Sequence, residues 1–109
     1  MGLAANKCEP CRGDVPPISP EEARELIREI PEWEMVEGAT KIRKTFRFRN
    51  FAQAMAFAGK VGDLAEEQGH HPDLSVGWGY CTVAFQTHKI HGLHRNDFIM
   101  AAKVNDLVP

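Results

Sequence analysis

The segment from Phe51 to Gln68 constrains the fold of this chain more than any other part of its sequence. Apolar residues recur there at the spacing of a helix that is buried along one side, which predicts a long helix packed on a sheet. Asn50 is suited to cap the first turn, and Gly69 stands where a left-handed residue commonly ends a helix. The apolar positions are 51, 54, 55, 58, 61, 62 and 65, with Phe57 and Leu64 widening the stripe.

Two further helices are expected, one near each end of the chain. Residues 19–22 read Ser-Pro-Glu-Glu, which places serine at an N-cap, proline at the first helical position and glutamate at the third. Apolar residues then recur at helical spacing as far as Ile30, and Pro31 ends the pattern. A last helix is expected over residues 95–107, with an inner face of Phe98, Ala101, Ala102 and Val104.

Four short strands are expected between these helices. Residues 33–36 and 41–48 flank a turn at Glu37-Gly38, and residues 74–76 and 80–87 flank Gly77-Trp78-Gly79. In the second strand Lys44 is the one residue on the apolar side that does not fit the alternation. The order α-β-β-α-β-β-α implies an α+β fold, with helices packed on one face of a four-stranded antiparallel sheet.

Length and charge are those of one small globular unit. The chain has 109 residues, of which 43% are hydrophobic and 26% charged. We expect a loose arm over residues 1–18 and a single domain over residues 19–109. A net charge of −2 offers no basic patch for direct nucleic-acid binding. No stretch has the length of a signal peptide or the ~20 apolar residues of a membrane span, so a cytoplasmic protein is expected.

Three cysteines in a chain without an export signal do not predict a disulfide framework. Cys8 and Cys11 form a lone C-x-x-C in a presumed loop. A redox or zinc role is an alternative there, but a second pair of ligands and the βαβ context of a redox site are both missing. Cys81 is expected to be a small buried residue of a strand.

Five of the acid–base side chains between residues 66 and 97 form an ordered pattern. Their order is E-x-x-x-H-H-P, then an aromatic residue, then T-H, then an aspartate nine residues later. They are Glu66, His70, His71, His88 and Asp97. Histidine titrates nearer to neutrality than other side chains, so histidines flanked by carboxylates are suited to proton transfer on a neutral substrate.

The predicted elements place these residues at three element ends. Glu66 and His70 lie one helical turn apart, so we expect the carboxylate to orient that imidazole. His70 and His71 follow the negative end of the helix dipole, His88 closes a strand, and Asp97 opens the last helix. Each residue taken singly also has an ordinary explanation, as a solvated or capping histidine or as an acid in a first helical turn.

The chain resembles the pterin-4a-carbinolamine dehydratases from about Trp33 through Val104. The matching positions, in order, are Glu66, His70, His71, Pro72, Trp78, His88 and Asp97. This resemblance implies dehydration of 4a-hydroxytetrahydropterin, the product of aromatic amino-acid hydroxylases, to quinonoid dihydropterin and water. It implies no metal and no organic cofactor, and it implies a homodimer or homotetramer with a possible link to such a hydroxylase.

The same resemblance assigns roles within the site. It implies that His70, His71 and His88 surround the 4a-hydroxyl, and that Asp97 and Glu66 orient them and balance their charge. Which histidine is the principal acid stays open at this level.

Five further residues are expected to hold the flat pterin ring: Asp73, Leu74, Ser75, Thr87 and Trp78. For Trp78 the alternative is a hairpin aromatic that packs on its partner strand.

Two alternatives to this enzyme remain beside a small metal-dependent redox protein built on Cys8 and Cys11. One is a non-catalytic binding or assembly module of the same fold, like a transcription coactivator or a Rubisco assembly protein. The other is a metal site on the run His88, His91 and His94, against which Gly92 argues because it interrupts helical stacking. His94 also departs from the threonine or serine that the family commonly has at this N-cap, and imidazole is a less favoured cap.

Overall fold

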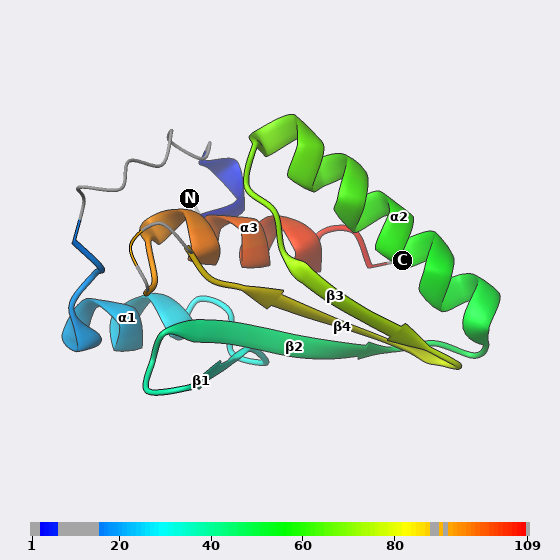
Figure 1. Cartoon of the computed structure of the whole chain (residues 1–109), viewed down its shortest axis with the longest axis horizontal. Coiled ribbons are helices and arrows are strands. Elements are labelled where there is room, and N and C mark those ends of the chain that lie inside the picture. The colour runs from blue at the N-terminus through cyan, green and yellow to red at the C-terminus, as the bar shows by residue number, and fades with distance from the viewer. Residues whose placement is uncertain (1–2, 7–15, 88–89, 91, 109) are drawn as a thin grey trace.

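The computed structural model describes residues 3–6, 16–87, 90 and 92–108 (Figure 1). It confirms the expected α+β fold and the order α-β-β-α-β-β-α. A short 3₁₀ helix precedes these elements. The elements are η1 (Leu3–Ala5), α1 (Pro20–Ile27), β1 (Glu34–Val36), β2 (Lys41–Arg47), α2 (Phe51–Gln68), β3 (Asp73–Gly77), β4 (Tyr80–Phe85) and α3 (Arg95–Asn105).

The four strands form one antiparallel sheet in the order β1-β2-β4-β3. The longest pairing joins β2 to β4, from Ile42 opposite Phe85 to Arg47 opposite Tyr80. Buried and more exposed residues alternate along both strands, so one face of the sheet is apolar. Helices α2 and α3 lie over that face and α1 lies beside the start of β2 (Figure 1), and β3 and β1 are left as the edge strands.

Helix α2 begins and ends where the local sequence predicts. The Asn50 side chain accepts a hydrogen bond from the backbone N–H of Gln53 at 2.8 Å, and Gly69 ends the helix with a left-handed φ of 67°. Phe57 packs on Phe46 of β2, with ring centroids 4.7 Å apart. The inner face consists of Ala54, Phe57, Ala58, Val61 and Ala65.

Hydrogen bonds from Trp33 and Lys44 hold the C-terminal end of α3 against the sheet. Trp33 Nε1 donates to Asn105 Oδ1 at 3.0 Å, and Lys44 Nζ donates to the same oxygen at 3.5 Å. Lys44 also pairs with Glu32 at 2.9 Å and lies 4.5 Å above the Phe46 ring. These contacts explain why a lysine is tolerated on the apolar side of β2.

Part of the N-terminal arm differs from the expected loose segment. Leu3 in η1 is only 2% exposed and belongs to the hydrophobic core. The backbone oxygen of Ala4 accepts a hydrogen bond from Lys103 Nζ of α3 at 2.8 Å. An isolated apolar residue carries no periodic signal, so sequence patterns did not reveal this contact. Cys8 and Cys11 lie outside the described residues.

Two element ends also differ from expectation. Strand β4 ends at Phe85, and Thr87 forms an isolated bridge with Gly92 instead of continuing the strand. Helix α1 ends at Ile27, although Ile30 is fully buried in the turns that follow. Among the described residues, no helix has both the length and the apolar character needed to cross a membrane.

Candidate active site

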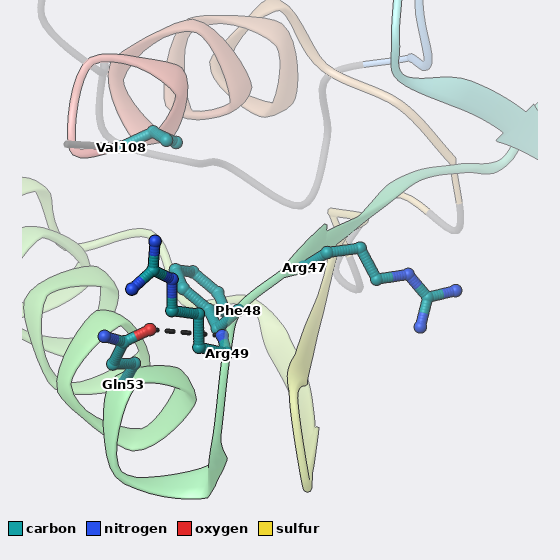
Figure 2. Close-up of a pocket in the computed structure, with 5 residues that line it drawn as sticks. All are labelled: Arg47, Phe48, Arg49, Gln53 and Val108. Carbon is teal, nitrogen blue, oxygen red and sulfur yellow. Dashed lines mark hydrogen bonds between the residues drawn. The ribbon is translucent and has the colours of Figure 1, made fainter.

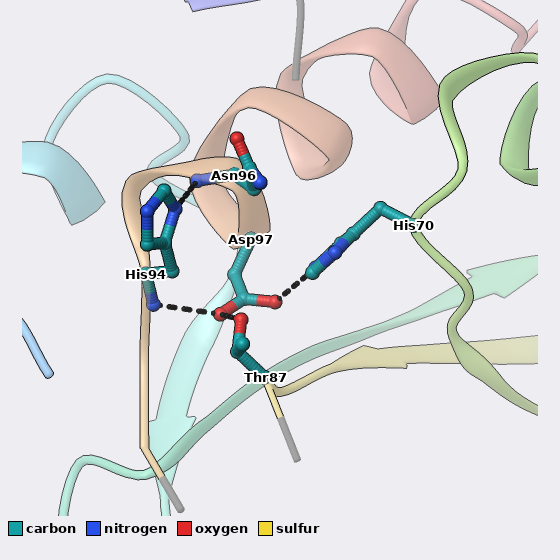
Figure 3. A network of polar contacts seen from close by, with 5 residues as sticks. All are labelled: His70, Thr87, His94, Asn96 and Asp97. Carbon is teal, nitrogen blue, oxygen red and sulfur yellow. Dashed lines mark hydrogen bonds and ion pairs between the residues drawn. The ribbon is translucent and has the colours of Figure 1, made fainter. Parts of the chain in front are cut away.

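Asp97 lies at the centre of a buried polar network (Figure 3). Its side chain has no exposed surface. Oδ1 accepts a hydrogen bond from His70 Nε2 at 2.6 Å, while Oδ2 accepts from Thr87 Oγ1 at 2.8 Å and from the backbone N–H of His94 at 2.9 Å. An ionised carboxylate only accepts hydrogen bonds, so all three partners act as donors.

Three different elements supply this network. Asp97 belongs to the first turn of α3, Thr87 lies just beyond β4, and His70 follows the C-cap Gly69 of α2. The left-handed turn at Gly69 redirects the chain and turns His70 inward, where it is 8% exposed. The imidazole stacks on Phe85 with a centroid distance of 6.1 Å. His70 is therefore held by a ring contact and by a carboxylate.

Glu66 pairs with His71, so the expected pair of Glu66 with His70 is wrong. Glu66 Oε2 lies 2.5 Å from His71 Nε2, and the two side chains are 77% and 61% exposed. The expectation assumed that helical geometry continues to residue 70. Gly69 ends that geometry, so the residue that returns over the last turn of α2 is His71.

Both adjacent histidines use the same ring nitrogen for a carboxylate. Because Nε2 donates to Asp97 or to Glu66, the neutral form of each ring carries its proton on Nε2 and has an accepting Nδ1. A second proton on either ring would then bind at Nδ1. The two rings differ in surroundings, since His70 is buried and His71 is exposed.

The remaining expected site residues fall into two places. Asp73, Leu74 and Ser75 lie exposed at the start of β3, separated from the histidine pair by Pro72. Thr87 is 3% exposed and donates its hydroxyl proton to Asp97. His88 lies outside the described residues.

Trp78 is not brought to the histidines of its own chain. It lies beyond Gly77, at the opposite end of β3 from Asp73, and the strand between them spans about 13 Å. Its side chain is 74% exposed, so it does not pack on a partner strand either. Neither role considered for Trp78 in the sequence matches this position.

A cleft among the described residues lies elsewhere (Figure 2). It has a volume of about 350 Å³ and is lined by Arg47, Phe48, Arg49, Gln53 and Val108. None of the expected acid–base residues lines it, and Arg47 points away from the other four side chains. The candidate site is therefore the buried network and the exposed pair beside it.

His94 is the N-cap of α3, as the sequence predicted, but its bond to Asp97 was not predicted. Its Nδ1 accepts a hydrogen bond from the backbone N–H of Asn96 at 3.0 Å, and its own N–H is bonded to Asp97. The less favoured imidazole cap is thus formed. The available signal was an aspartate three residues after the N-cap, which is the spacing of a capping box.

Metal and thiol chemistry find little support in the described part of the chain. No group of three or more described histidine, cysteine, aspartate or glutamate side chains is placed to hold a metal ion. Of the run His88, His91 and His94, only His94 is described. Burial raises the pKa of the Cys81 thiol, which keeps it protonated at neutral pH.

Comparisons with known proteins identify the family of this chain. A family model described as pterin 4 alpha carbinolamine dehydratase matches residues 16–107. A Methylococcus capsulatus protein provisionally named a pterin-4-alpha-carbinolamine dehydratase is 59% identical over 96% of this chain and 92% of its own length. A similarly named Cupriavidus pinatubonensis protein is 53% identical over 96% of this chain and 90% of its own.

Two solved structures share the fold. A transcriptional coactivator/pterin dehydratase from Brucella melitensis is 28% identical, with a TM-score of 0.79 over 85% of this chain and 99% of that one. A pterin dehydratase-like protein identified as a RuBisCO assembly factor in the alpha-carboxysome is 26% identical, with a TM-score of 0.60 over 70% of this chain and 88% of that one. The family model and these near full-length identities show that the chain belongs to the pterin-4a-carbinolamine dehydratase family.

Proposed function

We propose that this protein dehydrates a 4a-hydroxytetrahydropterin to a quinonoid dihydropterin and water by histidine acid–base catalysis. The observation that carries the proposal is the pair of adjacent histidines, each bonded through Nε2 to its own carboxylate. A purely structural surface has no need of a buried His70–Asp97 pair, because burying two ionisable groups costs free energy.

The reaction requires only two proton movements. The lone pair of the ring nitrogen next to carbon 4a forms a C=N bond as the C–O bond breaks. The hydroxyl leaves as water after receiving one proton, and the ring nitrogen loses its own proton. A general acid and a general base in reach of these atoms supply roughly 10²–10⁴-fold acceleration.

The two histidines are suited to these two tasks. Each neutral imidazole accepts a proton at Nδ1 while its Nε2–H stays bonded to a carboxylate, and each imidazolium donates that proton again. Asp97 and Glu66 stabilise the cationic forms of His70 and His71. His88, which follows Thr87 in the chain, is proposed as the third histidine around the hydroxyl.

We propose that the pterin ring binds at the start of β3. Among the described residues β3 pairs with β4 alone, so its outer edge offers backbone N–H and C=O groups that no described strand uses. Such an edge matches the alternating donors and acceptors of a pterin. The exposed Leu74 side chain offers an apolar contact beside Asp73 and Ser75.

The test is dehydration of freshly generated 4a-hydroxytetrahydropterin, followed by absorbance with and without protein. We expect the wild-type protein to exceed the spontaneous rate, and His70→Ala, His71→Ala and His88→Ala each to slow it. Circular dichroism serves as the control for folding. Wild-type rates in all three variants would contradict the histidine mechanism.

The alternative is an assembly or binding module, as in the RuBisCO assembly factor of similar fold. It predicts a folded protein without dehydratase activity. Activity that the histidine substitutions remove would decide for the enzyme, and would support a role in recycling the pterin of an aromatic amino-acid hydroxylase.

A further inference from the structure

We propose that His94 is a positioning residue for the His70–Asp97 pair, and that it acts only while its imidazole is unprotonated. The kinetic part of this inference rests on the proposed function. Its structural part concerns the start of α3 and stands without that function.

His94 makes both hydrogen bonds that define the start of α3. Its backbone is extended, with φ −118° and ψ 159°, as an N-cap residue requires. Nδ1 accepts from the N–H of Asn96 at 3.0 Å, and the backbone N–H donates to Asp97 Oδ2 at 2.9 Å (Figure 3). The conformation that caps the helix is therefore the same one that directs a donor to the buried carboxylate.

The cap requires the neutral ring. A nitrogen that accepts a hydrogen bond carries no proton, so the His94 proton is on Nε2. Protonation would place a hydrogen on Nδ1 and remove the acceptor for Asn96 N–H. It would also place a positive charge at the positive end of the helix dipole. Both effects weaken the cap as the pH falls through the range of about 5 to 8 where histidines titrate.

The described surroundings of His94 contain no carboxylate that would retain a proton on the ring. On its own helix lie Arg95, which is exposed, and Asp97, whose oxygens already accept from three donors. His70 lies across that carboxylate. The chain packed beside the preceding loop is uncharged, with Ile18 N–H bonded to Leu93 O at 3.0 Å.

The acidic residues in the first turn of α1 form no described ion pair with the His94 ring either. These acids, Glu21 and Glu22, are exposed, and Glu21 pairs with Arg24 at 3.6 Å. Among the described residues, no ion pair joins the His94 imidazole to any carboxylate. A protonated His94 would thus lose the hydrogen bond of the cap, and none of the described ion pairs would replace it.

Loss of the His94 cap would affect His70 through the Asp97 carboxylate, which is bonded to both residues. When the first turn of α3 frays, Asp97 loses the N–H of His94 and its fixed orientation. His70 then loses the acceptor that holds its Nε2 proton. Serine or threonine at this position would cap α3 without titrating near neutral pH, so this dependence on pH belongs to the histidine.

The test compares wild type with His94→Ser and His94→Ala. Serine caps a helix at any pH, whereas alanine does not. We expect His94→Ala to lower the dehydration rate about fivefold at pH 8, the size of a lost N-cap, and His94→Ser to restore it. Between pH 8 and pH 6 the ratio of the wild-type rate to the His94→Ser rate should fall about threefold to tenfold.

Two readouts do not depend on catalysis. Nitrogen NMR of the imidazoles should show His70 with its proton fixed on Nε2 in wild type and His94→Ser, and a mixture of forms in His94→Ala. Urea unfolding should show wild type losing more stability than His94→Ser on acidification. These two results hold even if the protein has no dehydratase activity, which would refute the proposed function alone.

Overlapping pH profiles of wild type and His94→Ser, in both unfolding and rate, would overturn the proposal. An unchanged His70 spectrum in a folded His94→Ala would overturn it as well, since the cap would then not position the pair.

Discussion

At the scale of single residues, the site depends on how fully the buried Asp97 carboxylate is hydrogen-bonded. Asp97 has no exposed surface, and an unpaired charge there would cost several kcal/mol. The His70 imidazole, the Thr87 hydroxyl and the His94 backbone N–H each donate a hydrogen bond to Asp97, and these bonds offset that cost. The Glu66–His71 pair has the same chemistry, but water screens it because both side chains are more than half exposed.

This contrast predicts unequal effects of two matched substitutions. We expect Asp97→Asn to lower kcat by about 100-fold or more, because the buried His70 loses the charge that stabilises its imidazolium. Glu66→Gln should lower kcat by less than about tenfold, because solvent already stabilises the charged form of His71. Steady-state kinetics at pH 7 provide the measurement. Equal losses in both variants would show that burial of the pair is unimportant.

Thr87 is expected to position Asp97 and not to bind substrate. We predict that Thr87→Val lowers kcat about tenfold, the effect of losing one hydrogen bond to a carboxylate, while KM stays unchanged. Thr82→Val is the matched control, because its hydroxyl bonds to Thr45 on the outer face of the sheet, with 2.8 Å between oxygens. A raised KM with unchanged kcat would instead return Thr87 to the pterin-binding set.

At the scale of elements, the end of α2 decides which histidine turns inward. Gly69 has a φ of 67°, a conformation that other residues adopt only at a cost. Because of this turn the two adjacent histidines have different partners: His70 is directed to Asp97 and His71 to Glu66.

Two glycines of this region therefore respond oppositely to alanine. Gly69→Ala should destabilise the protein by about 1–2 kcal/mol and slow dehydration. Gly62→Ala should stabilise it by about 0.5–1 kcal/mol, because alanine is favoured within a helix. A Cβ added at either position meets no atom within 4 Å, so only the backbone conformation distinguishes them. Urea unfolding measures both, and a neutral Gly69→Ala would remove the glycine argument.

At the scale of the whole molecule, contacts distant in sequence hold α3 at both ends. Its first turn is bonded to the His70 region, and Asn105 at its last turn is bonded to Trp33. The N-terminal η1 packs on the same helix through Leu3 and through Lys103.

Leu3→Ala should lower the free energy of unfolding by about 2–5 kcal/mol, as expected for truncating a buried leucine. The dehydration rate of the folded protein should stay unchanged, because η1 supplies no residue to the network. Ala5→Ser, at an exposed position of η1, is the control. If both variants unfolded alike, the arm would be as loose as the sequence predicted.

The complete protein is also expected to act without a metal ion, since the proposed reaction needs proton transfer alone. After dialysis against a strong chelator, the dehydration rate should equal that of untreated protein. A loss of rate that zinc restores would favour the Cys8–Cys11 or the His88–His91–His94 alternatives.

Local patterns were enough to predict most of the elements and the family. Asn50 and Gly69 define α2 through hydrogen bonds and dihedral angles within a few residues, and such signals are complete in the sequence. The ordered acid–base residues likewise identified the family before any geometry was known.

Pairing among those residues was decided only by the tertiary structure. His70 and Asp97 are 27 positions apart, and whether they meet depends on how α2, β4 and α3 pack. Helical geometry predicted the pair Glu66–His70. The left-handed Gly69 ends that geometry, so Glu66 pairs with His71 instead. The sequence by itself thus determined the elements and the chemistry available, because these depend on local interactions. Burial and partner choice depend on contacts between distant segments, so they were decided by the packed fold.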